Sequence, residues 1–591
     1  MNDDTPAPSA GPVAGQRPLS GGWMFVLALV VGAFGGFGSI VFKGAIAFFQ
    51  NLFFLGRFDV HLQPDTHIDP SIWGWGVIFV PVVGAVIVTW IIRTLAPEAR
   101  GHGVPEVMHA IYYHGGEMRP ITVVAKAIAS SVSIGTGGSV GREGPIIQIG
   151  SAFGSTLGRF RNMPARQRIV LVGAGAAAGI AATFNAPLGG LAFAVELMLI
   201  SVTALNVALV ASATVAATYI GRLYSGIGPS FEIPSVELFA DHAIGSYQLL
   251  LCVPFGLLVG LAAAGFVHSI YWFEDRFESL FHNDYLRHMS GMFVLGLMMY
   301  GFLWYLDEYY IAGVGYATIL DVLREVLTNP LLLLLLFAGK LVATGLTLGS
   351  GASGGVFSPS LFLGATLGAS FADGLQWLVP GLQIDPVVFA IAGMAGMVGA
   401  TTSAVVTAIV MIFEQTRDYS AMLPIITVVA LAYVVRTRIT AESIYTLKLA
   451  RRGLGIPQGL QAAVSLSRKA RRVMNPDFQV IDLDDLRQWQ EEHVPGEGPR
   501  YTVVAKEGQL YGLAREDLRY VMRDRELSEL VDTRFIVVPP TTRWPVLMRA
   551  IKEGGHEVVL VARGRASRDL LGVITPREIA LTVRDAAELM D

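Results

Sequence analysis

Hydrophobic and polar positions are distributed very unevenly along this chain. Long stretches without charged residues lie between about residues 23 and 445, whereas residues 448–591 show an ordinary mixture of charged and apolar side chains. A stretch of about 20 apolar residues is long enough to cross the hydrocarbon core of a bilayer as a helix. The contrast predicts a protein that crosses a membrane many times and carries a soluble domain at its C-terminal end.

The apolar stretches are bounded by charges or interrupted by glycine and proline. The first, 23–41, is followed by Lys43, and the second, 72–92, by Arg93. The later ones are residues 169–200, 202–220, 247–267, 292–306, 331–348, 386–413 and 422–435. Several are too long or too short for one perpendicular crossing. Broken helices persist at membrane depth only where their freed backbone groups line a polar cavity or are buried in protein, so the pattern favours a transporter over a simple anchor.

The composition supports this division and excludes several classes of protein. Hydrophobic residues make up 53% of the chain and charged residues 15%, against about 25% charged in soluble domains. The single cysteine, Cys252, excludes an intrachain disulfide and a zinc site built on cysteines. The net charge of −4 gives no basic field for nucleic acid. His102, His109 and His114 do not fall on one helix face, so we expect no metal site.

Charge and composition also divide the chain into four parts. Residues 1–20 are rich in Pro, Ala, Gly and Ser and are predicted to be disordered. A transport domain, 21–446, a basic linker, 447–472, and a soluble domain, 473–591, follow. Four arginines within residues 159–168 and five basic residues within 436–452 mark cytoplasmic segments. We therefore expect an integral protein of the cell membrane with both termini in the cytoplasm.

The apolar part of the chain contains an internal repeat. Residues 133–154 align with residues 347–368 at a constant offset of 214. The coinciding pairs are Gly135 and Gly349, Gly137 and Gly351, Gly141 and Gly355, Pro145 and Pro359, Gly150 and Gly364, Gly154 and Gly368, Lys126 and Lys340 and, at an offset of 218, Glu196 and Glu414. Two related halves with broken helices predict a binding site at their interface. The sequence alone leaves open whether the repeats are parallel or inverted.

Three short motifs combine glycine with proline: GHGVP at 101–105, GREGP at 141–145 and GVFSP at 355–359. Each predicts a helix end, because proline suits a first helical turn and glycine adopts unusual backbone angles. A helix N-terminus offers unpaired N–H groups and about half a positive charge. Several such ends that converge would bind a small anion without a fixed cation, which would hold the ion too tightly for rapid release.

Glu143 lies within the second of these motifs. An ionisable group inside a membrane-spanning region is costly and marks a functional site. A carboxylate beside an anion site made of helix ends would compete with the anion, and its protonation would release the site. We therefore expect Glu143 to act as gate and proton acceptor. A structural ion pair with the adjacent Arg142 is the alternative.

The three motifs together with Tyr445 resemble the CLC family of chloride channels and proton/chloride exchangers. The segments FNAPLGGLAFAVE at 184–196 and VMIFEQT at 410–416 belong to the same resemblance, which spans residues 21–445. It implies an all-α polytopic membrane protein with two inverted repeats of tilted, broken helices. It also implies a homodimer within membrane lipid, with a separate chloride pathway in each subunit.

The resemblance further implies which residues form the site. Glu143 would be the gating glutamate. The N–H groups of Val356 and Phe357 and the hydroxyl of Tyr445 would hold the central anion. The complete set of expected anion-binding residues is His102, Gly103, Arg142, Gly144, Val356, Phe357 and Tyr445.

Two positions depart from the family's pattern. The first motif commonly has serine at its second position, where this chain has His102. A neutral imidazole can still donate one N–H group to an anion, or it can turn away and leave only backbone at the path. Leu197 stands where many exchangers carry a second glutamate for the internal proton path, and Glu196 would project about 100° away on a helix. This favours channel-like chloride flow, and a proton-coupled chloride exchanger is the alternative.

The soluble region reads as two α/β units. The first has strand-like residues 501–514 and then the helix-like REDLRYVM. The second has strand-like residues 535–540 and 557–562 around a helical segment, and ends in LLGVITPREIA at 570–580. The arrangement resembles a cytoplasmic pair of CBS domains, a module attached to many CLC proteins.

CBS pairs often bind adenine nucleotides, and the resemblance implies candidate residues for such a site. Asp517 and Glu578 would contact ribose, and Thr575 would lie near phosphate. A purely structural dimerising domain is the alternative.

Two other functions are compatible with parts of the sequence. A CBS-containing divalent-cation transporter would need several intramembrane acids at one pore, and few are present. An intramembrane hydrolase would need a serine placed beside His102. We expect a chloride transporter that is not an enzyme and requires no cofactor, whose partners are a second copy of the chain, lipid, chloride and, in the exchanger alternative, protons.

Overall fold

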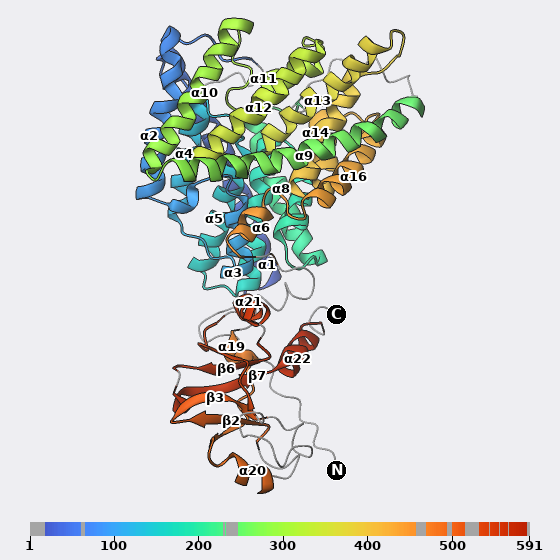
Figure 1. The fold of residues 1–591 in the computed structure, drawn as a ribbon. Coiled ribbons are helices and arrows are strands. Elements are labelled where there is room, and N and C mark those ends of the chain that lie inside the picture. The colour runs from blue at the N-terminus through green and yellow to red at the C-terminus, as the bar shows by residue number, and fades with distance from the viewer. Residues whose placement is uncertain are drawn as a thin grey trace. The chain divides into compact units, whose positions relative to one another are not determined.

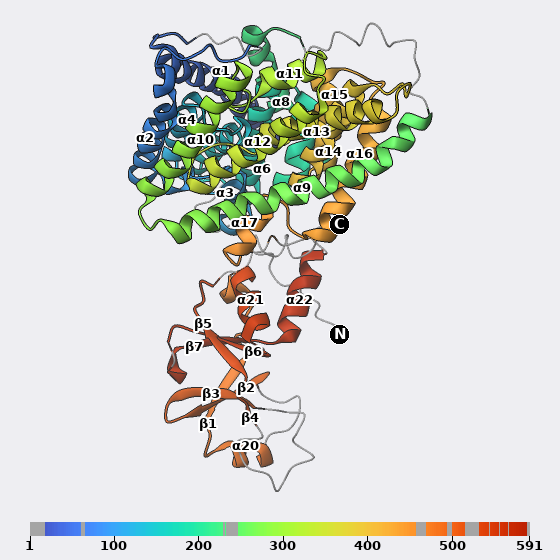
Figure 2. The same ribbon diagram turned by 45° about the horizontal axis from the view of Figure 1, so that its top comes forward.

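The structure is a computed structural model that describes residues 18–60, 66–228, 231, 246–454, 456, 469–492, 499–514, 531–542, 544–554, 556–564 and 566–587. Its chain separates into two units, Met1–Gly455 and Ile456–Asp591, which are described one at a time. Figures 1 and 2 show the first unit as a bundle of helices and the second as strands with a few helices. Among the described residues, 8 helices are long and apolar enough to cross a membrane, which confirms the predicted membrane body.

The first half of the helical unit contains α1 (Gly21–Gln50), α2 (Val80–Thr94), α3 (Val104–His114), α4 (Ile121–Gly135), α5 (Glu143–Phe160), α6 (Ala165–Phe184), α7 (Pro187–Phe193) and α8 (Ala204–Ser225). The second half contains α9 (Ser246–Leu280), α10 (Asp284–Leu306), α11 (Tyr316–Leu323), α12 (Pro330–Ser350), α13 (Phe357–Leu378), α14 (Pro386–Thr402), α15 (Val405–Thr416) and α16 (Met422–Ile439), followed by the short α17 (Thr446–Arg451). The 35-residue α9 runs along one side of this unit (Figure 2).

Two predicted spans are each divided into two helices. The stretch 169–200 is interrupted at Asn185, with φ of 56°, where α6 ends, and 386–413 is interrupted at Ser403, with φ of 64°, where α14 ends. A residue in the left-handed conformation commonly ends a helix. Hydropathy does not reveal these breaks, because the residues on both sides are apolar.

The predicted boundaries of other spans also need correction. The first span does not end before Lys43, since the helical segment continues to Leu55. Helices α4, α5 and α13 were not among the predicted spans. Both α5 and α13 contain many glycine, serine and threonine residues, and most of their side chains are buried in protein. Because these helices face other helices rather than lipid, their hydropathy is low.

The two halves of this unit are related by a local twofold axis. Gly141 and Gly355, which occupy the same place in the repeat, exchange backbone hydrogen bonds of 2.7 and 2.6 Å in an antiparallel bridge. Equivalent segments that pair antiparallel at the same residue run in opposite directions about an axis between them. The repeats are therefore inverted, as the family resemblance implied.

Side chains that coincide in the repeat make equivalent contacts. The amine of Lys126 donates to the carbonyls of Ala99 and Gly101, at 2.9 and 2.6 Å. The amine of Lys340 donates to the carbonyls of Ile311 and Gly313, at 3.1 and 2.8 Å. Each buried amine thus fixes the loop before a short helix, α3 in one half and α11 in the other. The loops match as well, GHG at 101–103 and GVG at 313–315.

The two repeat glutamates cap helices in the opposite halves. Glu196 accepts hydrogen bonds from the N–H groups of Val406 and Thr407, both 2.8 Å, at the start of α15. Glu414 accepts from the N–H groups of Leu188 and Gly189, at 3.1 and 2.7 Å, at the start of α7. Neither helix has a capping side chain of its own, because an alanine precedes each. Each half therefore supplies the negative charge that the other half's helix N-terminus favours.

Glycine also sets the packing in both halves. A β-carbon at Gly150 of α5 would lie 2.2 Å from the carbonyl oxygen of Gly175 in α6. A β-carbon at Gly364 of α13 would lie 2.2 Å from the carbonyl oxygen of Gly393 in α14. Only glycine allows the two backbones to approach this closely, as in other tightly packed membrane helices.

The second unit contains two small sheets. Strands β1 (Phe478–Asp482), β2 (Tyr501–Lys506), β3 (Gln509–Ala514) and β4 (Val531–Asp532) form one sheet in that order, and β5 (Phe535–Val538), β6 (Val558–Ala562) and β7 (Leu570–Ile574) form the other. The helices are α19 (Ala470–Val473), α20 (Leu486–Glu492), α21 (Trp544–Gly554) and α22 (Pro576–Ala587). Apolar residues of α21, β6 and β7 form a core that includes Leu547, Val559 and Ile574. The predicted α/β character is confirmed.

One prediction in this unit is wrong in detail. The strand-like residues 501–514 form a hairpin of two antiparallel strands rather than one strand. Its turn lies at Glu507 and Gly508, both with positive φ, a conformation typical of tight hairpin turns. The helix predicted to follow, residues 515–522, lies outside the described residues.

Candidate functional site

Backbone hydrogen bonds join the three glycine–proline motifs in one place. Gly101 of the first motif donates to the carbonyl of Ala352 at 2.9 Å and accepts from the N–H group of Gly354 at 3.3 Å. The pairing of Gly141 with Gly355 joins the second motif to the third. The starts of α3, α5 and α13 therefore meet, as the motifs predicted.

The carboxylate of Glu143 reaches from the first turn of α5 to the first turn of α13. Its side chain is only 1% exposed. One oxygen, Oε1, accepts hydrogen bonds from the hydroxyls of Tyr316, at 2.8 Å, and Ser358. The other, Oε2, accepts from the N–H group of Ser358 at 3.4 Å. A negative group thus already occupies the positive end of α13, where an anion would bind.

Arg142 takes no part in an ion pair with Glu143 in the described structure. Its guanidinium lies over the ring of Tyr316, 4.8 Å from the ring centre, and its buried Nε has no hydrogen-bond partner there. The cation–π contact places the positive charge against the ring of the tyrosine whose hydroxyl holds Glu143. The sequence-based alternative of a structural pair between the two neighbours is not what the side chains form.

The other expected anion-binding residues are buried in the same region. Val356 and Phe357 are 1% and 4% exposed at the start of α13, and Tyr445 is 2% exposed just before α17. His102 is 4% exposed, and its ring centre lies 5.8 Å from that of Tyr445. Its Nδ1 has no hydrogen-bond partner among the described atoms. The imidazole therefore lies next to Tyr445 and keeps a ring nitrogen for a ligand.

Two glycines make this arrangement possible. Gly103 directly precedes α3 and has φ of 83°, a backbone conformation that favours glycine. A β-carbon at Gly144 would lie 2.1 Å from the carbonyl oxygen of His102. The close approach brings the loop of the first motif onto the first turn of α5.

Sequence reasoning missed two residues of the site, Tyr316 and Ser358. Ser358 lies inside the motif GVFSP, where its position next to Phe357 was the available signal. Tyr316 starts α11 directly after GVG, the second-half counterpart of GHG. Extending the internal repeat to that segment would have pointed to it.

Position 197 of this chain is a leucine, whereas many exchangers of the family carry a glutamate there for the internal proton path. Leu197 is 8% exposed in a π-helical turn, Ala194–Met198. The carboxylate of Glu196 is engaged by the start of α15. The expectation that Glu196 does not replace the missing group agrees with these contacts.

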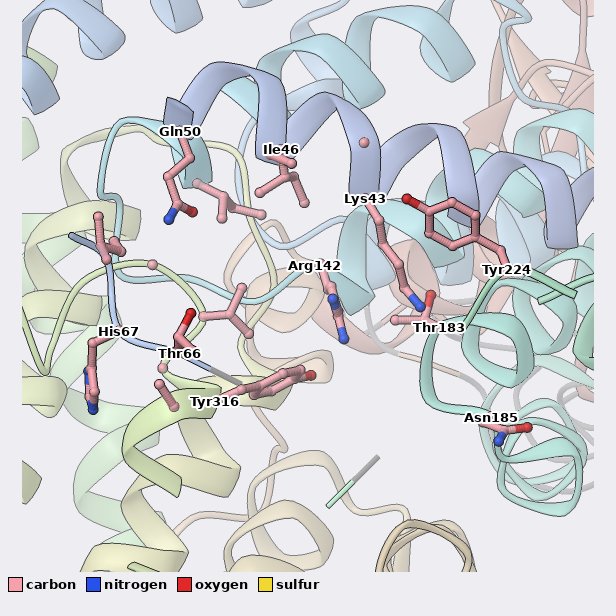
Figure 3. Close-up of a pocket in the computed structure, with 18 of the residues that line it drawn as sticks. Lys43, Ile46, Gln50, Thr66, His67, Arg142, Thr183, Asn185, Tyr224 and Tyr316 are labelled. Atoms are coloured by element: carbon pink, nitrogen blue, oxygen red, sulfur yellow. The ribbon is translucent and has the colours of Figure 1, made fainter. Parts of the chain in front are cut away.

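Two cavities lie near the site. One, of about 650 Å³, is lined by Arg142, Tyr316, Lys43 and Thr183 among others, and Figure 3 shows these four side chains around it. The other, of about 640 Å³, is lined by Glu106, Glu274, Lys448 and Arg452 among others. Glu106 lies 3.5 Å from the Lys448 amine and 3.0 Å from the Arg452 guanidinium. Glu106 lies in the first turn of α3, four residues after His102 in the sequence.

The candidate nucleotide residues have a structural use in the second unit. Glu578 accepts hydrogen bonds from the N–H group and hydroxyl of Thr575, at 3.1 and 2.6 Å, and from the Tyr501 hydroxyl at 2.7 Å. Thr575 and Glu578 thus form a capping box at the start of α22. Burial raises the pKa of Glu578, but these hydrogen bonds outweigh it and hold the pKa below its usual range. Asp517 lies outside the described residues.

Known proteins are similar to the helical unit in both sequence and fold. The family described as "Voltage gated chloride channel" matches residues 84–437. The H(+)/Cl(−) exchange transporter ClcA of Vibrio parahaemolyticus is 31% identical over 449 residues, which cover 74% of this chain and 91% of that protein.

Two solved structures resemble the fold. A slow cyanobacterial Cl−/H+ antiporter has a TM-score of 0.63 and 25% identity, and covers 74% of this chain and 99% of its own. A eukaryotic CLC transporter has a TM-score of 0.62 and 20% identity, and covers 94% of this chain and 97% of its own. With the inverted repeat and the meeting helix starts, these matches show that the chain belongs to the voltage-gated chloride channel (CLC) family and has the CLC transporter fold.

Proposed function

We propose that this protein exchanges chloride for protons across a membrane, with Glu143 as gate and proton carrier. The observation that carries the proposal is the Glu143 carboxylate at the start of α13, held by Ser358 and Tyr316. In this position it competes directly with an anion for the same helix end. Protonation removes the charge that the helix end attracts, so the side chain leaves and chloride takes its place.

The exchanger replaces the channel-like flow that Leu197 favoured. The relative from Vibrio parahaemolyticus is named an exchange transporter, and the cyanobacterial structure is described as an antiporter. Although residue 197 is apolar, other carboxylates lie in this part of the helical unit. Glu106 and Glu274 both line the second cavity, and titratable groups in such a cavity supply proton access.

His102 is assigned the place that serine occupies in the family's first motif. Its unpartnered Nδ1 and its position beside Tyr445 support a role as ligand of the central anion, together with the N–H groups of Val356 and Phe357. A neutral imidazole donates one N–H group, so it contributes a hydrogen bond without a fixed charge.

Liposomes that contain the purified protein, a steep chloride gradient and a pH-sensitive dye test the exchanger. We expect chloride flow to drive protons against their own gradient, and Glu143→Gln to abolish proton movement while chloride still crosses. Glu117→Gln is the matched control, because that carboxylate pairs with Arg168 and its side chain is 58% exposed. Chloride flux without proton movement in the wild type would restore the channel interpretation.

Several expectations remain predictions from the sequence. They are the homodimer, the cytoplasmic position of both termini, the CBS pair and its adenine nucleotide. The two small sheets of the second unit are consistent with a CBS pair.

A further inference from the structure

Lys43 carries a positive charge within a membrane-spanning helix. It belongs to α1, inside the helical segment Gly21–Leu55, which has no acidic residue. A cation in such a place is costly and indicates a functional site. The side chain points into the cavity of about 650 Å³ beside Arg142 and Thr183 (Figure 3). In the part of the chain that the structure describes, its amine has no hydrogen-bond or ion-pair partner.

Arg142 is the second unpaired cation of this cavity. Its guanidinium faces the ring of Tyr316 and forms no ion pair with a described residue. Lys43 and Arg142 line the same cavity and both point into it (Figure 3), where two positive charges repel each other. Lys43 belongs to α1 and Arg142 directly precedes α5, so the fold holds both cations at this cavity.

The other basic side chains that line this cavity, Arg222 and His67, already have partners. Arg222 donates to the side-chain oxygen of Asn185 at 2.6 Å. His67 lies 2.6 Å from the carboxylate of Asp321. Among the described residues that line the cavity there is no aspartate or glutamate. No described side chain therefore neutralises Lys43 and Arg142.

We propose that Lys43 and Arg142 form a capture site for a small monovalent anion, which an incoming chloride occupies before it displaces the Glu143 carboxylate. An anion between the two cations adds two attractions that offset their repulsion, in a partly buried place where charges are weakly screened. Tyr316 lines the same cavity, and its hydroxyl holds Glu143. The capture site is therefore one side chain away from the gate.

The identity of the ion as chloride rests on the proposed function, whereas the presence of an anion site rests on the cavity alone. Capture of an ion by two cations differs from steering by the general positive field. Steering depends on every nearby cation and disappears at high ionic strength. A site depends on these two residues and persists.

Bound ions can be located and counted without any transport measurement. Crystals of the wild-type protein grown in bromide should show anomalous density between the Lys43 amine and the Arg142 guanidinium. Radiolabelled chloride binding should show that Lys43→Met removes one ion per subunit, while Lys43→Arg retains it. Empty density at this place in bromide-loaded crystals would overturn the proposal, and so would unchanged binding stoichiometry in Lys43→Met. The bromide experiment needs no variant and therefore does not depend on the folding of one.

Chloride flux then tests the use of the site. We expect Lys43→Met to raise the chloride concentration for half-maximal flux about tenfold, the loss of one charge-assisted contact, with the ratio of protons to chloride unchanged. Arg57→Gln is the matched control, because Arg57 is an exposed cation two residues after the helical segment Gly21–Leu55 and does not line the cavity. Equal effects of both variants that vanish at high ionic strength would show steering and overturn the capture site. A wild type that moves no protons would refute the exchanger and leave the capture site standing.

Discussion

Removing the Tyr316 hydroxyl should move the pH dependence of chloride flux upward. In Tyr316→Phe the Glu143 carboxylate loses its 2.8 Å hydrogen bond but keeps both contacts with Ser358. A hydrogen bond to a charged group contributes about 1.5–3 kcal/mol. The bond stabilises the carboxylate only while it is ionised and seated at α13. Its loss therefore makes protonation and departure of Glu143 easier.

The size of the shift follows from this free energy. One pH unit corresponds to about 1.4 kcal/mol, so the pH of half-maximal flux should rise by roughly one to two units. The assay is chloride efflux from liposomes over a range of pH. Tyr309→Phe is the matched control. Tyr309 lines the same cavity of about 650 Å³ as Tyr316, but its hydroxyl accepts a hydrogen bond from the N–H group of Ser71 and not from a group of the gate. An unchanged or lower midpoint in Tyr316→Phe would refute the argument that this hydroxyl holds the gate closed.

Three further predictions concern other parts of the molecule. Gly364→Val should prevent assembly of the helical unit, because its side chain would meet the carbonyl oxygen of Gly393 at 2.2 Å, and the amount of folded protein on size-exclusion chromatography measures this. The pKa of Glu578 is held low in the folded state, so its contribution to stability is present above the unfolded pKa of about 4.3 and is lost as pH falls through the folded value. Thermal melts of the second unit at decreasing pH should therefore be flatter in Glu578→Gln than in the wild type, and identical pH profiles would contradict the capping role. Deletion of residues 473–591 should leave chloride binding intact, because every site residue precedes that region, and loss of binding in a correctly folded truncated protein would show otherwise.

The sequence predicted the parts of the site that depend on local backbone chemistry. The three motifs begin helices because glycine and proline constrain the chain within a few residues, and the repeat register correctly paired Lys126 with Lys340 and Glu196 with Glu414. These predictions succeed because each needs only neighbouring residues or an internal comparison.

What the sequence did not reveal depends on contacts between distant segments. Nothing near Glu143 indicates that its carboxylate reaches Ser358 and Tyr316, 215 and 173 positions away. Hydropathy likewise marked Lys43 as the end of a span, because a charge is tolerated inside a membrane helix only when the fold provides a polar cavity. The helices that surround that cavity come from both halves, so it exists only after the chain has folded.

Glu196 and Glu414 each cap a helix of the opposite half, and this reciprocal capping suggests how such a chain could arise. A half-length chain that ended before α9 would carry the carboxylate for a partner's helix and lack the one for its own α7. Two copies related by a twofold axis like the one at Gly141 and Gly355 would supply each other's missing group. The present chain has the arrangement expected of two such halves joined in one polypeptide, and the starts of α5 and α13 meet at the axis between them. Expressed apart, the two halves should each be incomplete, yet mixing them should restore both caps at once.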